Sequence, residues 1–153
     1  MSGSGFLDNN YNKSVEQIEL LLRRVCFYVK KRGRSILDNY DITPAQFEAL
    51  QIVINHQEVT ISELSNHLYQ APSTITDLVD RMEGKELVQR VRNCKDRRIV
   101  KIIPLEKGQK VLDAVLDARR VFLGEALKDV NLKDQAQFIN YLEVLSKAYN
   151  DRV

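Results

Sequence analysis

The sequence predicts a mostly α-helical fold with one small β element, an α+β chain in which four helices, two strands and two further helices follow one another. Through most of its 153 residues, apolar side chains recur every three or four positions, as they do along amphipathic helices. Residues 88–92 and 99–103 are instead rich in β-branched side chains, with a turn-forming segment at 93–96 between them. At 44% hydrophobic residues the chain can bury a core, and no apolar run is long enough to span a membrane.

The first helix is expected over residues 14–39, where apolar residues follow at helical spacing: Val15, Ile18, Leu22, Val25, Val29 and Ile36. Residues 1–12 are expected to form a disordered N-terminal segment, whose Ser-Gly-Ser-Gly opening is compatible with a cloning remnant. This end does not resemble a signal peptide, and the two cysteines imply no disulfide framework. We therefore expect a cytoplasmic protein.

Helix starts are marked by capping boxes, in which an N-cap hydroxyl and a side chain three residues later satisfy each other's backbone N–H groups. Thr43 and Gln46 have this spacing, and so do Thr60 and Glu63. Residues 69–71 then form a turn before a fourth helix, which begins at Pro72. Two short helices joined by a three-residue turn predict a helix-turn-helix, and the β-hairpin that follows predicts a wing.

We expect the winged helix-turn-helix lobe to span residues 43–104. Residues 14–40 and 106–150 are expected to form a helical dimerisation region together. Their apolar stripes have a near-heptad spacing that suits helix–helix packing. The same stripes would suit an intramolecular bundle equally well, so periodicity alone leaves dimerisation open.

Positive charge is concentrated in one short segment. The whole chain carries a net charge of +2, whereas residues 85–101 alone carry +5. Such local concentration is what a phosphate-binding element needs, because cations that displace condensed counterions supply much of the affinity for DNA. An exposed, solvated hairpin would show the same charge, so this observation alone does not decide between the two.

The order and spacing of several motifs resemble the MarR family of bacterial transcription regulators. They are Thr-Ile-Ser-Glu-Leu at 60–64, the run from Ser73 to Glu83, Leu-Val-Gln-Arg at 87–90, Asp-Arg-Arg at 96–98 and Glu-Lys-Gly at 106–108. The resemblance covers nearly everything from Ser14 onward. It implies a homodimeric regulator of double-stranded DNA, usually a repressor, that is often released by a small molecule or by oxidation. A twofold dimer would place its recognition helices roughly 34–36 Å apart on a pseudo-palindromic operator.

The fourth helix is the expected recognition helix, and its outer face carries Ser73, Thr74, Thr76, Asp77 and Arg81. The three hydroxyls are candidates for base or phosphate contact, although residues of this kind are also common at helix starts. Asp77 departs from the family, which is often basic at this position. A carboxylate there would repel phosphate unless it accepts from a cytosine amino group or pairs with Arg81, and we favour the pair.

The expected wing carries most of the cations: Arg90, Arg92, Lys95, Arg97 and Arg98, together with Asp96. By resemblance, the Asp-Arg-Arg motif places Arg98 in the minor groove, with Asp96 fixing that side chain or the hairpin. Arginine in a narrow minor groove reads shape more than sequence. The wing is thus expected to supply most of the affinity, while the helix sets register. The alternative is an exposed hairpin stiffened by an Asp–Arg pair.

An effector pocket is expected by family analogy between the dimerisation helices and the DNA-binding lobe, with Tyr28, Arg32, Phe47 and Phe122 as candidate lining residues. Each of them could equally be ordinary core or surface, and the sequence names no ligand and no cofactor. His56 and His67 are isolated in the sequence, so we expect no metal site.

Three alternative functions are weighed against a ligand-responsive repressor. Redox-sensing members of the family carry a reactive cysteine on the first helix, which makes Cys26 a candidate, although a buried structural thiol is commoner. Cys94 is expected at the wing tip, where an incidental surface cysteine is the simpler interpretation. A winged-helix module that binds protein is the second alternative. An enzyme is the third, and we expect none because no phosphate loop, nucleophile–histidine pair or carboxylate dyad is present.

Overall fold

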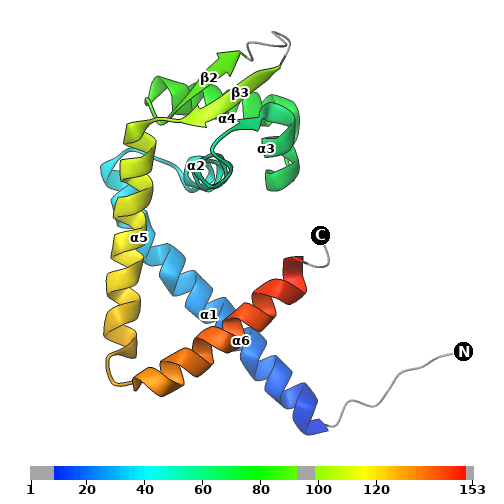
Figure 1. Ribbon diagram of the computed structural model, residues 1–153, viewed down its shortest axis with the longest axis vertical. Helices are drawn as coiled ribbons and strands as arrows, with labels where there is room; N and C mark the ends of the chain where they lie inside the picture. Colours follow the sequence, from blue (N-terminus) through cyan, green and yellow to red (C-terminus); the bar gives the residue numbers. More distant parts are fainter. Residues whose placement is uncertain (1–8, 93–98, 151–153) are drawn as a thin grey trace, which may run out of the picture. The chain divides into compact units, whose positions relative to one another are not determined.

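A computed structural model describes residues 9–92 and 99–150 of the chain. Its elements are α1 (Asn9–Asn39), α2 (Pro44–His56), β1 (Val59–Thr60), α3 (Ile61–Leu68), α4 (Pro72–Gly84), β2 (Val88–Arg92), β3 (Val100–Pro104), α5 (Glu106–Leu127) and α6 (Leu132–Asn150). Figure 1 labels all of them except the short strand β1. The predicted fold class and element order are confirmed. The two-residue strand β1 is an addition that the sequence pattern did not predict.

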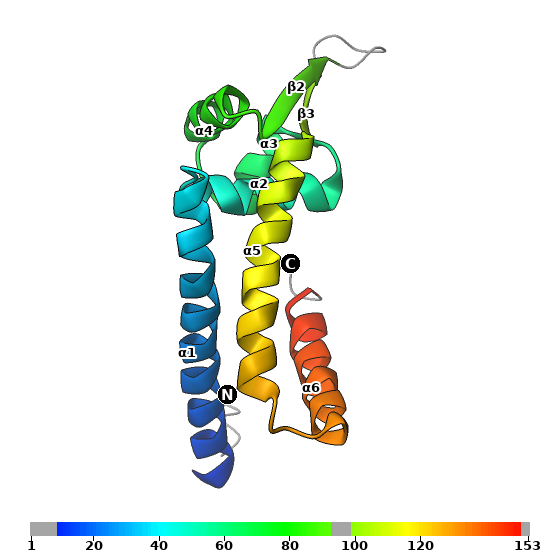
Figure 2. The same ribbon diagram turned by 90° about the vertical axis from the view of Figure 1, so that its left-hand side faces the viewer.

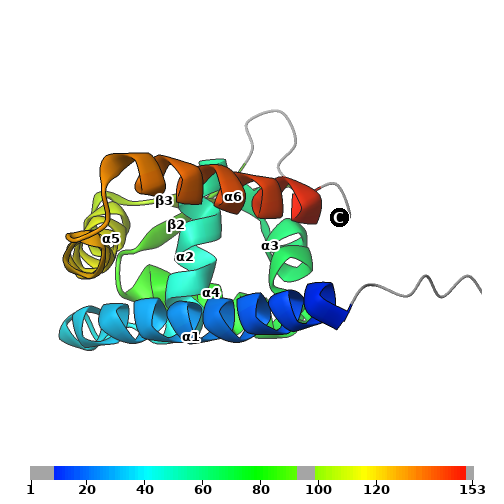
Figure 3. The same cartoon turned by 90° about the horizontal axis from the view of Figure 1, so that it is seen from below.

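Helix α1 is one uninterrupted helix (Figure 3) and begins at Asn9, five residues before the predicted start. The expectation of disorder over residues 1–12 is therefore wrong for residues 9–12, and residues 1–8 lie outside the described part. Tyr11 explains the difference, since it lies four residues before Val15 and continues the same apolar stripe toward the N-terminus. None of the described helices is long and apolar enough to cross a membrane.

Both predicted capping boxes are present. Thr43 Oγ1 accepts a hydrogen bond from the Gln46 backbone N–H at 3.2 Å, and Gln46 Oε1 accepts one from the Thr43 N–H at 3.0 Å. The second box repeats this arrangement at Thr60, whose backbone N–H donates to Glu63 Oε2 at 2.7 Å. The pKa of Glu63 is lowered by its hydrogen bonds from the backbone and the hydroxyl of Thr60. The N-termini of α2 and α3 are thus fixed by hydrogen bonds between the N-cap residue and the residue three positions later.

The chain divides into two compact units, residues 1–119 and 120–153, and the boundary lies inside α5. This differs from the predicted boundaries of 43–104 for the winged lobe and 14–40 with 106–150 for the other helices. The physical reason is the core of the first unit, which reaches past residues 43–104. Leu37 at the end of α1 and Val111 and Val115 of α5 are buried in the same cluster as Leu50.

The sheet is antiparallel, in the order β1-β3-β2. Strands β2 and β3 form a hairpin, visible in Figure 2, whose register pairs Arg90 with Ile102. The start of α5 is fastened to the base of this hairpin. The backbone N–H of Leu105 donates to the carbonyl of Leu87 at 3.0 Å, and a Cβ on Gly108 would lie 2.3 Å from that same oxygen. Only glycine allows α5 to approach so closely.

Candidate nucleic-acid interface

Helix α4 presents a polar outer face that is held in place from behind. Ile75, Val79 and Met82 are fully buried and fix its inner face in the core. The predicted recognition residues all lie exposed on the other side: Ser73, Thr74, Thr76, Asp77 and Arg81. Within this set, the Thr76 hydroxyl donates to the carbonyl of Pro72 at 2.9 Å. Side chains at the start of α4 are therefore available to a groove of DNA, in the way that a recognition helix requires.

The predicted pair between Asp77 and Arg81 is wrong, because no ion pair joins these two described side chains. Two other carboxylates of α4, those of Asp80 and Glu83, pair with Arg90 on β2, and Asp80 lies 2.6 Å from its Nη1. Strand β2 runs beside α4 and brings a half-buried guanidinium to it, which attracts a carboxylate more strongly than an exposed neighbour on the same helix does.

Arg90 ties the wing to the recognition helix through four contacts. Its backbone N–H donates to Glu83 Oε1 at 2.7 Å, and its guanidinium pairs with the carboxylates of both Glu83 and Asp80. Nη2 also donates to the backbone carbonyl of Thr76 at 3.3 Å. Burial works to lower the pKa of Arg90, but its hydrogen bonds to the carboxylates of Asp80 and Glu83 outweigh it and raise that pKa. Arg90 therefore positions β2 against α4, and its predicted contact with DNA stays a prediction.

The positive segment 85–101 carries less free charge at its base than its composition indicates. Of its described cations, Lys85 pairs with Asp41 and Lys101 pairs with Glu58, in addition to the Arg90 pairs. Arg92 is exposed. Lys95, Asp96, Arg97 and Arg98, predicted to form the wing tip, lie outside the described residues, as does Cys94. Counting charge along the sequence missed these carboxylate partners because they come from the turn after α1, from α4 and from the loop before β1.

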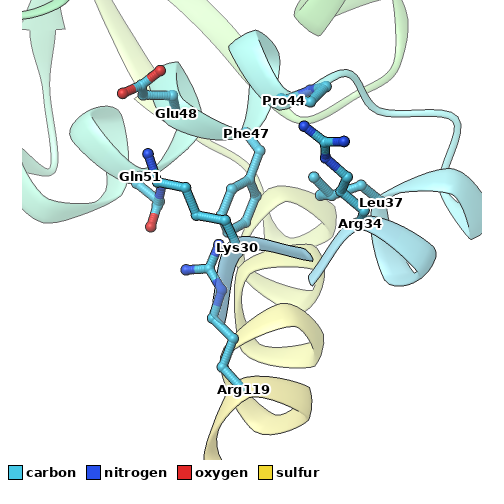
Figure 4. A pocket seen from close by; sticks show the side chains of 8 residues that line it. All are labelled: Lys30, Arg34, Leu37, Pro44, Phe47, Glu48, Gln51 and Arg119. Atoms are coloured by element: carbon cyan, nitrogen blue, oxygen red, sulfur yellow. The ribbon is translucent and has the colours of Figure 1, made fainter. Parts of the chain in front are cut away.

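A cavity of about 120 Å³ lies within the first unit. Figure 4 shows its lining, which is drawn from α1, α2 and α5 and consists of Lys30, Arg34, Leu37, Pro44, Phe47, Glu48, Gln51 and Arg119. Among the predicted pocket residues Phe47 lines this cavity, whereas Tyr28, Arg32 and Phe122 do not. Tyr28 lines a separate open hollow along α1, and Phe122 belongs to the second unit. Sequence reasoning missed Arg119, because its neighbours in the cavity come from distant parts of the chain.

Arg119 is the least satisfied polar group in this cavity. Its guanidinium carbon lies 5.3 Å from the centroid of the Phe47 ring, within the range of a cation–π contact. Its Nε is buried and, among the described residues, has no hydrogen-bond partner. Burial lowers the pKa of Arg119. Gly33 makes the close approach possible, because a Cβ at that position would lie 2.9 Å from Val115 and 3.3 Å from the Arg119 Nε.

The histidines and the first cysteine differ from expectation. His56 and His67, isolated in the sequence, lie with their ring centroids 4.8 Å apart at the ends of α2 and α3. Nevertheless, no group of three or more potential metal ligands occurs among the described residues. Cys26 is a free thiol on the exposed surface of α1 rather than a buried structural one.

Known proteins are similar to this chain both in sequence and in the arrangement of helices and strands. The family model described as "MarR family" matches residues 42–100. A solved MarR family protein from Bacillus stearothermophilus is 41% identical and superimposes with a TM-score of 0.81, covering 91% of this chain and 97% of that one. The chain belongs to the MarR family. The MarR family match includes the helix-turn-helix and reaches the first residue of β3, so the protein is a DNA-binding transcription regulator.

Curated relatives include two HTH-type transcription regulators from Bacillus subtilis. The uncharacterised HTH-type transcriptional regulator YsmB is 40% identical over 124 residues, which make up 81% of this chain and 85% of the relative. The HTH-type transcriptional repressor MdtR is 26% identical over 89% of this chain and 90% of its own length. The similarity thus extends well beyond the residues of the MarR family model and includes parts of the long helices on either side.

Proposed function

We propose that the protein is a repressor that binds a pseudo-palindromic operator as a homodimer and is released from it by a small-molecule ligand. The description of MdtR as a repressor supports the direction of regulation. The observation that carries the proposal is the large apolar surface left exposed on α1 and α6, since one chain offers one recognition helix and therefore reads one half-site. We assign the protein no catalytic step.

The exposed apolar surface has the form of stripes. On α1, Tyr11, Val15, Ile18 and Val25 lie on one side of the helix, and each is about half exposed. On α6 the exposed apolar residues are Leu132, Phe138, Ile139, Tyr141, Leu142, Val144 and Leu145. Rows of exposed large apolar side chains such as these are typical of helices that pack against a partner. A second copy of the chain offers the same stripes and would cover them symmetrically.

Oligomeric state and salt dependence test this part of the proposal. Sedimentation analysis is expected to give a dimer, and the double variant Ile18→Glu with Val25→Glu is expected to shift it toward monomer and to weaken binding to the promoter region of the protein's own gene. Binding should decline steeply as salt rises, because several phosphates are neutralised. A monomeric wild type, or weak DNA binding with little salt dependence, would instead favour a module that binds protein.

The cavity at Arg119 is the proposed ligand site. Lys30, Arg34 and Arg119 outnumber the single carboxylate of Glu48, and the rings of Phe47 and Pro44 add an apolar wall. A buried donor without a partner indicates that a hydrogen-bond acceptor is missing. The site therefore fits a small organic anion with an apolar part. Because the cavity is bounded by α2 of the helix-turn-helix core and by α1 and α5, an occupant would alter how these helices pack.

The substitution Arg119→Gln tests the site. Candidate organic anions should release wild-type protein from DNA but release the variant only at much higher concentration. Arg120→Gln removes the same charge from an exposed neighbouring position and should leave the response unchanged. If both variants respond as the wild type does, the ligand site lies elsewhere.

A redox switch through Cys26 is the second candidate, favoured by the exposure of its thiol. In that case peroxide would weaken DNA binding by the wild type, and Cys26→Ser would abolish the response. A peroxide response that survives in Cys26→Ser but disappears in Cys94→Ser would move the switch to the other cysteine. No response in the wild type would exclude both.

A further inference from the structure

We propose that Tyr69, in the turn between α3 and α4, is a DNA-backbone contact that positions the recognition helix through its phenol group. The sequence analysis assigned residues 69–71 only to the turn. Tyr69 is 87% exposed, more than any other large apolar or aromatic side chain for which the structure gives an exposed fraction. A side chain this large that contacts so little of its own protein has no packing role to explain it.

The backbone of Tyr69 adopts a conformation that side chains other than glycine rarely take. Its φ of 53° and ψ of 41° place it in the left-handed region at the C-cap of α3. Glycine is the usual residue there, because a Cβ is unfavourable in this region. The position therefore carries a bulky aromatic at a cost to folding. Strained residues of this kind persist where the surroundings hold them and function requires them.

The surroundings of Tyr69 do hold it firmly. Its backbone N–H donates to the carbonyl of Asn66 at 3.3 Å, and the next N–H, of Gln70, donates to the carbonyl of Ser65 at 3.2 Å. The buried Ser65 hydroxyl donates back to the Gln70 carbonyl. Two bonds between Ser65 and Gln70 thus close the turn around Tyr69. The phenol is presented from a fixed corner rather than from a loose loop.

The place of this corner points to DNA as the partner. Tyr69 comes three residues before Pro72, the first residue of α4, and so lies at the end of the recognition helix that approaches DNA. In helix-turn-helix proteins the first helix crosses the phosphate backbone, and tyrosine hydroxyls are among the donors that bind phosphate oxygens. A phenol at the corner between the two helices is suited to that contact.

The chemistry of α4 explains why an uncharged donor is useful at this corner. The exposed residues near its start are hydroxyls and Asp77, whereas Arg81 lies more than two turns further along the helix. Arg90, which β2 brings to α4, is already paired with Asp80 and Glu83. Among the described residues, cations are therefore scarce near the start of α4. A phenol donates to a phosphate without adding charge beside Asp77. Tyr69 would then set the register of the helix and contribute affinity that is independent of base sequence.

The decisive variants are Tyr69→Gly and Tyr69→Phe, measured in the full-length protein against a duplex of its own promoter region and an unrelated duplex of equal length. Tyr69→Gly relieves the left-handed strain, so its melting temperature should rise by a few degrees while affinity for both duplexes falls by about tenfold. Tyr69→Phe should lose a similar factor at every salt concentration, because a neutral donor releases no counterions and leaves the slope of affinity against salt unchanged.

The control is Gln57→Gly, which relieves another positive φ, of 65°, at the end of α2 without changing charge. It should leave DNA affinity unaltered. If Tyr69→Gly folds poorly, Tyr69→Asn replaces it, because asparagine tolerates the left-handed region and lacks the ring. Tyr69→Asn should then show the loss of DNA affinity expected for Tyr69→Gly. Undiminished affinity in both Tyr69→Gly and Tyr69→Asn would overturn the proposal, and would indicate a protein contact if repression in cells were nevertheless lost. A change in the salt slope of Tyr69→Phe would also contradict it.

Discussion

The two helices of the helix-turn-helix are held in place by different means. Helix α3 begins with a capping box in which Thr60 and Glu63 satisfy each other. Helix α4 begins at Pro72, and its N-cap residue, Ala71, has no side chain that can cap it; the helix is held instead by its buried inner face and by Arg90 from β2. The support helix is thus fixed locally, whereas the recognition helix is fixed by the wing. Hydroxyls at the start of α4, such as Ser73, remain available to DNA for this reason.

The largest effect is expected for Arg98, which the sequence analysis predicts to bind DNA and which lies outside the described residues. Arg98→Ala should remove most of the affinity for DNA, roughly a hundredfold in a dimer that loses two minor-groove contacts. Thermal stability and dimerisation should be unchanged, and gel shifts at physiological salt together with sedimentation would show this. Unchanged DNA binding would exclude Arg98 as a contact.

Substitution of Arg90 should destabilise both the wing and the recognition helix, because this residue joins β2 to α4. Arg90→Ala removes a half-buried guanidinium and leaves the carboxylates of Asp80 and Glu83 without their partner. This loss should lower the free energy of unfolding by about 2 kcal/mol. Urea denaturation measures this loss. The exposed Arg92 serves as the matched control, since Arg92→Ala should weaken DNA binding and reduce its salt slope without destabilising the fold. Equal stability of the two variants would mean that Arg90 does not support α4.

A smaller effect should separate the starts of the two helices. Thr60→Ala removes the N-cap of α3 and should cost about 1 kcal/mol of stability. Ser73→Ala at the exposed start of α4 should cost almost no stability, because no side chain caps that helix, but it should weaken DNA binding. Thermal denaturation and a binding assay on both variants test the contrast. A reversed order of the two stabilities would show that α4 is capped after all.

The smallest effect concerns pH. The pKa of Glu63 is lowered in the folded protein by the hydrogen bonds from Thr60, so its ionised form favours the folded state. The resulting stability is present above the ordinary glutamate pKa of about 4.3 and is lost as pH falls through the lowered folded value. Exposure of the carboxylate keeps this contribution small. Glu63→Gln should flatten the acid limb of the stability profile slightly, and an unchanged limb would show that the box contributes no pH dependence.

Features that depend on neighbours in sequence could be predicted, and features that depend on distant partners could not. Each of the correctly predicted features depends on residues only a few positions apart. They are the caps at Thr43 and Thr60, the turn before α4 and the β-hairpin, and all of them occur in the structure. By contrast, the partner of Asp80 is a residue of β2, and the partner of His56 lies on another helix. Arg119 lines the cavity only because Gly33 lets α1 and α5 meet. Strand β1 is too short to show any period of its own.

The glycine at position 108 has a mechanical consequence. Its bare backbone allows the first turn of α5 to rest directly on the carbonyl of Leu87, one residue before β2, and the Leu105 N–H is bonded to the same oxygen. No side chain lies between the two elements to yield when one of them moves. The start of α5 and the base of the wing are therefore expected to move together as one rigid body. A rotation of this end of α5 would be transmitted directly to the wing.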